Sequence, residues 1–290
     1  MSRPEPSRLS EPAALVARLR AAGCLFAEEE AALLQAAASG PDLATLVVRR
    51  VAGEPLEHLL GWVEFAGARY VVTPDVFVPR RRSELLVSVV EGIVRRRNHH
   101  LRAVPDDFGG GLSVVVVDLC CGAGAIGAAI SARIPDAEVW ASDVDPAAVA
   151  CARRNLPPER VVEGDLYDGL PAGLRGRIGV VVANAPYVPT DAIATMPPEA
   201  RDHEPRIALD GGPDGLDLHR RVLGAAQWWL APGGVVVIET SAAQATETAA
   251  AAQAAGLTPR VVTNEEREAT AVVATLPPGK NSGPPYAGPL

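Results

Sequence analysis

Gly179-Val180-Val181-Val182-Ala183-Asn184-Ala185-Pro186-Tyr187 is the stretch of sequence that decides the fold. The run before Asn184 is apolar and rich in valine, which is typical of a strand covered on both faces of a sheet. Polar groups then follow at once: the Asn184 amide, the Ala185 carbonyl and the Tyr187 ring. Ligands of open α/β sheets bind beyond the carboxyl ends of the strands. We therefore expect a binding site at this strand end.

The chain around this stretch alternates predicted strands and helices. Strands are predicted at 113–119, 138–142, 160–162, 180–183 and 235–239, and helices at 125–133, 146–155, 216–230 and 242–255. Such alternation implies right-handed crossovers and a mostly parallel sheet with helices on its faces. One further strand is expected late, at 270–276, and we expect it to be antiparallel. The fold class is therefore α/β.

The N-terminal part has a different pattern. Leucine and alanine recur at helical spacing up to Val51, with breaks at Gly23 and Gly40, and residues 64–72 resemble a short hairpin that turns near Gly67. Residues 8–80 are thus predicted to be a helical domain with a hairpin, serving as a substrate-docking module or as a plain scaffold. The other predicted parts are a connecting helix and loop at 81–112, the α/β domain at 113–277 and a disordered tail at 278–290.

Composition limits the class of protein. Hydrophobic residues make up 48% of the 290 residues and charged residues 21%, which is ordinary for a globular chain with a sizeable core. No apolar run approaches the roughly 20 residues of a membrane span, and the first residues lack the apolar core of a secretory signal, so we expect a cytoplasmic protein.

The net charge of −8 is unevenly distributed. Residues 1–100 carry 13 basic and 12 acidic residues, whereas residues 101–290 carry 14 basic and 23 acidic residues. Phosphate neutralisation drives binding to duplex nucleic acid, and the acidic second part of the chain argues against such a partner.

No residue pattern predicts a metal site or a disulfide. Cys120 and Cys121 are neighbours, which bridge only with strain, and none of the four cysteines has zinc spacing. The pair His99-His100 has no third ligand in view and falls in the stretch 98–112, which is predicted to be a loop. We expect the cysteines to be packing residues and the protein to use no metal.

A glycine-rich loop follows the first predicted strand of the sheet. Gly122, Gly124 and Gly127 satisfy the G-x-G-x-x-G pattern, and Asp143 follows at about the distance of a ribose-binding acid, so a nicotinamide dehydrogenase is one interpretation. Asp118 precedes the glycines, which is common in S-adenosylmethionine enzymes, where such a carboxylate faces the cationic amino-acid end of the methyl donor. Asp145, before Pro146, fits a helix cap better than Asp143 does.

The strand end at Asn184 suits an amide or amine acceptor. An amide nitrogen is a poor nucleophile, because its lone pair is delocalised into the carbonyl. Two acceptors, the Asn184 side-chain oxygen and the Ala185 carbonyl, would hold its two N–H groups and orient the nitrogen. Tyr187 would stack on the flat amide and offer a π face to a nearby sulfonium. The product nitrogen loses its proton after transfer, so no strong base is required beforehand.

With these residues in place, the chain resembles the protein-(glutamine-N5) methyltransferases that act on peptide chain release factors. The resemblance spans about Glu54 to Leu276 and rests on Gly61…Glu64-Phe65, Pro79-Arg80…Ser83-Glu84, Asp118-Leu119…Gly122-Ala123-Gly124, Asn184…Pro186-Tyr187, Glu204-Pro205, Ala208-Leu209…Gly211-Gly212…Asp214-Gly215-Leu216, Pro232-Gly233-Gly234 and Glu239…Gln244.

This resemblance implies a Rossmann-like S-adenosylmethionine-dependent methyltransferase fold, preceded by a small helical domain, and methyl transfer to a glutamine side chain in a Gly-Gly-Gln loop. Asn184 and Tyr187 are the expected catalytic residues. The expected substrate contacts are Asn184, Ala185, Pro186 and Tyr187, and the expected cofactor contacts are Asp118, Cys120, Cys121, Gly122, Ala123, Gly124, Asp143, Asp165, Leu166 and Asn184.

Three departures from the family pattern leave the methyl acceptor open. Ala185 replaces a proline, Cys120 replaces the first loop glycine, and Arg81-Arg82 stand where the family has a proline and an acid. These departures are compatible with a divergent paralogue that has another protein substrate. Methylation of a small-molecule amine or of adenine remains an alternative, as does a cofactor-binding protein that has lost catalysis.

Overall fold

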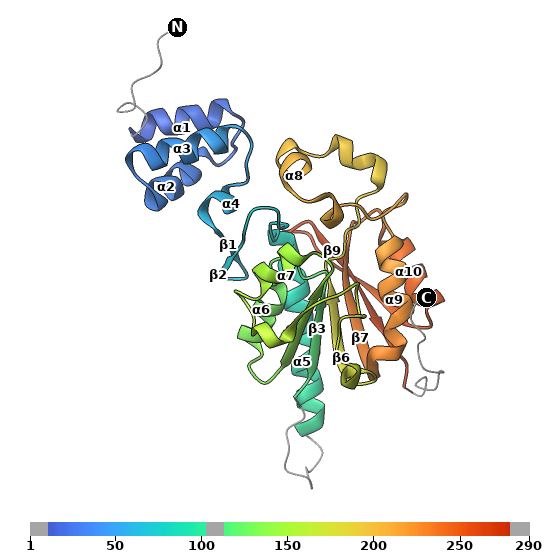
Figure 1. Ribbon diagram of the computed structural model, residues 1–290. Helices are drawn as coiled ribbons and strands as arrows, with labels where there is room; N and C mark the ends of the chain where they lie inside the picture. The colour runs from blue at the N-terminus through green and yellow to red at the C-terminus, as the bar shows by residue number, and fades with distance from the viewer. Residues whose placement is uncertain (1–10, 103–112, 279–290) are drawn as a thin grey trace.

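The computed structural model describes residues 11–102 and 113–278, and Figure 1 shows a central sheet with helices on its two faces. The described residues form a seven-stranded sheet of order β5-β4-β3-β6-β7-β9-β8. Its strands are β3 (Val115–Leu119), β4 (Glu138–Asp143), β5 (Val161–Glu163), β6 (Ile178–Ala183), β7 (Leu230–Thr240), β8 (Thr258–Asn264) and β9 (Ala269–Thr275). The first five in chain order pair in parallel, and β9 pairs antiparallel with β7 and β8. The predicted fold class is confirmed.

Alternate residues of the central strands pack on opposite faces of the sheet. One face carries Val116, Val180 and Val182 against α5 (Glu84–Arg102), α6 (Ala125–Arg133) and α7 (Pro146–Ala152). The other face carries Val117 and Val181 against α9 (Asp217–Trp229) and α10 (Ala245–Ala254). Burial on both faces explains why these strands are continuous valine-rich runs.

The N-terminal helices have a core of their own. α1 (Pro12–Ala21), α2 (Ala27–Ala37) and α3 (Gly40–Val51) bury Leu15, Leu19, Leu34, Leu43 and Val47 together. The short α4 (Leu56–Leu60) leads to the hairpin of β1 (Trp62–Phe65) and β2 (Ala68–Val71), whose apolar side chains belong to the core of the α/β part. Figure 1 shows the helical cluster and α8 (Pro198–His203) at the same end of the sheet.

Two secondary-structure predictions were wrong. The stretch 98–112 was predicted to be a loop, but α5 continues to Arg102, because the sequence has no glycine or proline between Gly92 and Pro105. The strand β8 was missed altogether. It is the edge strand of the sheet, and its side chains are mostly exposed, so it lacks the apolar run that identifies a buried strand.

Two sequence predictions fall outside the described residues. They are the Gly109-Gly110-Gly111 part of the predicted loop and almost all of the predicted tail at 278–290. The proposed division into parts at residues 80, 112 and 277 stays a prediction. No helix in the described ranges combines the length and the apolarity needed to cross a bilayer.

A buried ion pair connects the helical cluster to α8. Arg50 of α3 donates to the Glu30 carboxylate at 2.6 and 3.1 Å, and both side chains are almost fully buried. Arg50 also donates to Glu199 of α8 at 3.4 Å and to the Glu54 carbonyl at 3.1 Å. Because one guanidinium serves all three acceptors, its loss leaves the buried Glu30 carboxylate without its cationic partner.

We therefore expect Arg50→Ala to lower the free energy of unfolding by about 3 kcal/mol. The neighbouring Arg49 is a matched control, because its ion pair with Glu54 is half exposed and worth at most about 1 kcal/mol. Urea denaturation followed by far-UV circular dichroism measures both variants. If Arg49→Ala and Arg50→Ala lowered the free energy of unfolding equally, the buried ion pair would not be the stronger of the two, and the prediction would be wrong.

Candidate active site

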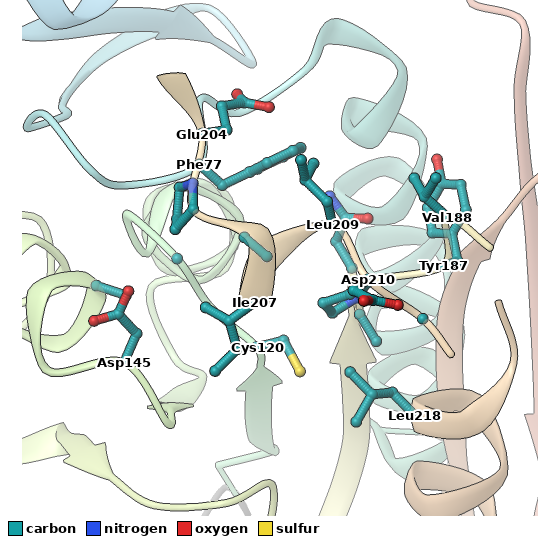
Figure 2. A pocket seen from close by; sticks show the side chains of 18 of the residues that line it. Phe77, Cys120, Asp145, Tyr187, Val188, Glu204, Ile207, Leu209, Asp210 and Leu218 are labelled. Carbon is teal, nitrogen blue, oxygen red and sulfur yellow. The ribbon is translucent and has the colours of Figure 1, made fainter. Parts of the chain in front are cut away.

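The register of three parallel strands brings their carboxyl ends to one place. Leu119 of β3 lies opposite Ser142 of β4 and Ala183 of β6, so the segments that follow these strands meet at one edge of the sheet. A cavity of about 1170 Å³ lies there. Figure 2 shows Cys120 at its base, Asp145 on one side and Tyr187 with Val188 on the other.

Most of the predicted site residues line this cavity. They are Cys120, Cys121, Gly122, Ala123, Asp143, Asp165, Leu166, Asn184, Ala185, Pro186 and Tyr187. Asp118 and Gly124 do not belong to the lining. The structure thus brings the glycine-rich loop and the Asn184 tetrapeptide together, as expected from the strand ends.

The glycine-rich loop packs closely against its neighbours. Gly122 donates its N–H to Asp143 Oδ2 at 2.8 Å, which joins the loop to the end of β4. Gly124 has a φ of +73°, and a Cβ there would come within 3.0 Å of Ala152, so only glycine fits this position. Cys120 has a φ of +54°, in the region that glycine favours, and a cysteine there is strained.

Asp145 caps a helix, as the sequence predicted, and Asp143 makes different contacts at the end of β4. Asp143 accepts hydrogen bonds from the Gly122 N–H and, through Oδ1, from the Asp145 N–H at 3.0 Å. Burial raises the pKa of the Asp143 carboxyl, and these two N–H groups oppose that rise. Asp145 caps α7 by accepting from the Ala147 N–H at 2.9 Å. Asp143 lines the cavity, and its role as a ribose-binding acid stays a prediction.

Asp118 lies beneath the loop, fully buried. Its Oδ2 accepts the Gly127 N–H at 2.8 Å, and Gly127 permits this approach because a Cβ would lie only 3.1 Å from the same oxygen. Its Oδ1 has no partner among the described residues. Burial raises the pKa of Asp118 to about 8; the Gly127 N–H opposes this rise, and the charge of Asp143 adds to it.

The segment after β5 reaches the cavity from the edge of the sheet. Ser142 Oγ donates to the Leu166 carbonyl at 2.8 Å and so holds this segment against β4. Asp165 Oδ2 accepts from Arg221 of α9 at 2.7 Å. Both Asp165 and Leu166 line the cavity, and their contact with a cofactor stays a prediction; Leu166 also has a positive φ of 55°.

The Asn184 amide is held by a residue that lies just before α5. Its Nδ2 donates to Ser83 Oγ at 3.3 Å, and Ser83 is buried. Among the described residues, Asn184 Oδ1 and the Ala185 carbonyl accept no hydrogen bond. Two acceptors are thus available side by side at the cavity wall, and Pro186 restricts Ala185 to extended backbone.

Tyr187 is fixed by Glu239 at the end of β7. The Tyr187 hydroxyl donates to Glu239 Oε1 at 3.1 Å, and Arg82 Nε donates to the same oxygen at 3.1 Å. The Arg82 guanidinium also lies 5.9 Å from the centre of the Tyr187 ring. Burial and the Glu239 charge raise the pKa of Tyr187, so its phenol stays protonated near neutral pH.

A return segment, residues 204–216, completes the wall. Val188 donates to the Leu209 carbonyl at 3.0 Å, and Gly211 donates back to the Val188 carbonyl at 2.9 Å. At its start, Glu204 accepts from the Val78 N–H at 3.1 Å and from Arg80 at 2.6 Å. The residues just before α5 and the return segment are therefore joined over the cavity.

The predicted set of site residues missed Arg82, Ser83, Glu204 and Glu239. All four lie in or beside sequence pieces that carried the family resemblance, which was the available signal. Their contacts join residues about 100 or more positions apart.

In the described parts of the chain, no group of three or more His, Cys, Asp or Glu side chains is placed to hold a metal ion.

Comparison with known proteins identifies the family. A family model described as the methyltransferase small domain matches residues 101–197. A release factor glutamine methyltransferase from Burkholderia pseudomallei is 38% identical over 211 residues, which cover 69% of this chain and 68% of the relative. The chain belongs to the release factor glutamine methyltransferase family. The resemblance inferred from the sequence is confirmed.

Other relatives match a smaller part of their length. A release factor glutamine methyltransferase from Geobacter sulfurreducens is 38% identical over 65% of this chain and 61% of the relative. A relative from Streptomyces pristinaespiralis is named 4-amino-L-phenylalanine/4-methylamino-L-phenylalanine methyltransferase, and it is 35% identical over 65% of this chain and 62% of the relative. The chain spans somewhat less than two thirds of these relatives. The match nevertheless sets aside the nicotinamide dehydrogenase interpretation.

The buried Asp118 gives the stability of the protein a defined pH dependence. Its folded-state pKa of about 8 lies above the ordinary value, so the folded state holds a proton that the unfolded chain releases. The stability that comes from this bound proton is fully present below about pH 4 and is lost as the pH rises toward 8. Between pH 4 and 8, we expect the free energy of unfolding of Asp118→Asn, measured by chemical denaturation, to fall less steeply with pH than that of the wild type. An unchanged slope would contradict the elevated pKa.

The strain at Cys120 predicts a stabilising substitution. Cys120→Gly should raise the free energy of unfolding by about 1 kcal/mol, because glycine adopts a φ of +54° without steric cost. Cys121→Gly is the matched control and should destabilise the protein, because Cys121 is buried and has no positive φ. Thermal denaturation compares the two, and destabilisation by Cys120→Gly would refute the strain at this position.

Proposed function

We propose that this protein transfers a methyl group from S-adenosylmethionine to the side-chain amide nitrogen of a protein glutamine. The observation that carries this proposal is the single cavity in which the glycine-rich loop after β3 faces Asn184-Ala185-Pro186-Tyr187 after β6. Two unoccupied acceptors and an aromatic ring on one wall suit a planar NH2 group. The opposite wall carries the glycine-rich loop and the acids Asp143 and Asp165.

The donor side of the cavity fits S-adenosylmethionine. Asp118 is a buried carboxylate with one unpartnered oxygen beneath the glycine-rich loop, and a cation bound above it would stabilise its ionised form. Asp143, at the cavity wall, keeps acceptor capacity for the ribose hydroxyls, and Asp165 and Leu166 would flank the adenine. When bound, the cofactor supplies a methyl group on a positively charged sulfur. Asp118 does not line the cavity, so its negative charge would favour the cationic cofactor from beneath the glycine-rich loop.

The acceptor side orients the glutamine amide. Asn184 Oδ1 and the Ala185 carbonyl would accept one N–H each, which fixes the amide plane so that the nitrogen lone pair, perpendicular to this plane, can face the donor side. Tyr187 covers the flat face of the amide, and its phenol is protonated, so it positions the substrate and takes no proton. The methylated nitrogen releases its proton after transfer.

The proposed substrate is a peptide chain release factor, with the glutamine in its Gly-Gly-Gln loop. Relatives that carry this name support the choice. Such a substrate would be met in the cytoplasm. The helical cluster would serve as its docking surface, since Arg50 of this cluster contacts Glu199 of α8, which lines the cavity. The acidity of residues 101–290 favours a protein over duplex nucleic acid as the partner.

Incubation of the protein with a release factor and S-adenosylmethionine, followed by mass analysis of the Gly-Gly-Gln peptide, tests the proposal. We expect one added methyl group on the glutamine. Asn184→Ala should lower kcat by about 100-fold or more, because an orienting acceptor is lost, while S-adenosylhomocysteine still binds in calorimetry.

Three outcomes would count against this function. Binding of NADH in place of S-adenosylhomocysteine would exclude the methyl donor. Full turnover by Asn184→Ala would remove Asn184 from the mechanism. Methylation of 4-amino-phenylalanine but not of the release factor would assign a small aromatic amine as the acceptor, as the name of the Streptomyces pristinaespiralis relative suggests.

A further inference from the structure

Three consecutive residues before and at the start of α5 contact three separate parts of the molecule, and two of these parts belong to the acceptor side. Arg82 donates to Glu239 at the end of β7, and Ser83 accepts from Asn184 after β6. Glu84 accepts from the Ala66 N–H in the turn between β1 and β2 at 3.0 Å. Arg82 and Ser83 thus reach the two side chains that would bind the glutamine, one directly and one through Glu239.

Ser83 limits the freedom of the Asn184 side chain. An asparagine carboxamide turns readily about its last torsion, and the broad well of that torsion does not define one orientation. Ser83 is 1% exposed, so its hydroxyl is a fixed point, and the 3.3 Å hydrogen bond from Asn184 Nδ2 ties the carboxamide to it. With the nitrogen engaged, Oδ1 is the atom left for a substrate N–H.

Arg82 acts on Tyr187 through a buried carboxylate. Glu239 has a side chain only 3% exposed, and its Oε1 receives both the Arg82 guanidinium and the Tyr187 hydroxyl. Its Oε2 has no partner among the described residues. Removal of Arg82 would leave a buried carboxylate whose one remaining donor is Tyr187, and a buried unpaired charge is strongly unfavourable. The position of the Tyr187 ring therefore depends on Arg82.

We propose that Ser83 and Arg82 are positioning residues for methyl transfer: Ser83 orients Asn184, and Arg82 orients Tyr187 through Glu239. This inference rests on the proposed function. Position 82 is also where this chain has arginine in place of the acid of the family pattern. Within this chain an acid at position 82 would repel Glu239 as a like charge, whereas Arg82 forms an ion pair with Glu239.

Steady-state kinetics with the release factor, calorimetry with S-adenosylhomocysteine and thermal denaturation test the proposal together. Ser83→Ala should lower kcat about 3- to 10-fold, the effect of one lost neutral hydrogen bond, with S-adenosylhomocysteine affinity within about twofold of wild type. Ser83→Thr keeps the hydroxyl and should restore kcat. Arg82→Ala should lower kcat further, and Arg82→Asp further still.

Two control variants lie on the exposed side of α5. Ser88 donates only to the Glu84 carbonyl, and Arg95 forms a surface ion pair with Glu91. Ser88→Ala and Arg95→Ala should leave kcat unchanged. Wild-type kcat in both Ser83→Ala and Arg82→Ala would overturn the proposal, as would a Ser83→Thr variant no more active than Ser83→Ala. A purely structural role would lower the melting temperature and leave kcat of the folded enzyme intact.

A measurement without substrate separates this inference from the proposed function. The side-chain amide resonance of Asn184, assigned by its loss in Asn184→Asp, should shift in Ser83→Ala and stay in place in Ser88→Ala. If wild-type protein does not methylate glutamine, the proposed function fails, and this resonance still decides whether Ser83 positions Asn184. An unshifted resonance in Ser83→Ala would overturn the positioning role.

Discussion

The parallel register of β4, β3 and β6 is the constraint on which the site depends. The chain enters the sheet at β3, adds β4 and β5 on one side and then returns to β6 on the other, so the order of strands reverses next to β3. Loops leaving neighbouring strands at such a point separate and open a crevice. The glycine-rich loop and Asn184 face each other because Leu119 is paired with Ala183, and a slip of one residue would turn every side chain of β6 to the other face.

The sheet alone supplies only the frame of the acceptor wall. Its side chains are held by residues that precede the sheet in the chain: Ser83 holds Asn184, and Arg82 meets Tyr187 at Glu239. The return segment closes the same wall, since Glu204 binds the Val78 N–H and Arg80. The buried pair of Arg50 and Glu30 extends this connection to Glu199 of α8, so the helical cluster, the segment before α5 and the cavity wall form one continuous set of contacts.

The sequence predicted the parts of the molecule whose signal is local. Buried strands such as β3 and β6 are apolar runs, the glycines at 122 and 124 mark the loop, and Asp145 before Pro146 marks a helix cap. The edge strand β8 was not predicted, because its side chains are mostly exposed and its sequence lacks the apolar run of a buried strand. The unpartnered oxygen of Asp118 and the pairing of Arg82 with Glu239 depend on packing between distant residues, which a single sequence does not encode in any local pattern. The cavity residues at the ends of β3, β4, β5 and β6 were therefore predictable, and the contacts that orient their side chains were not.

A crystal structure of the protein with S-adenosylhomocysteine and a Gly-Gly-Gln peptide tests most directly that one cavity holds both reactants. The glutamine side-chain nitrogen should lie within hydrogen-bond distance of Asn184 Oδ1 and of the Ala185 carbonyl, with the cofactor product on the glycine-rich loop beside Asp143. A glutamine amide bound away from Asn184, or a cofactor product bound outside the cavity at the ends of β3 and β6, would contradict a shared methyl-transfer site.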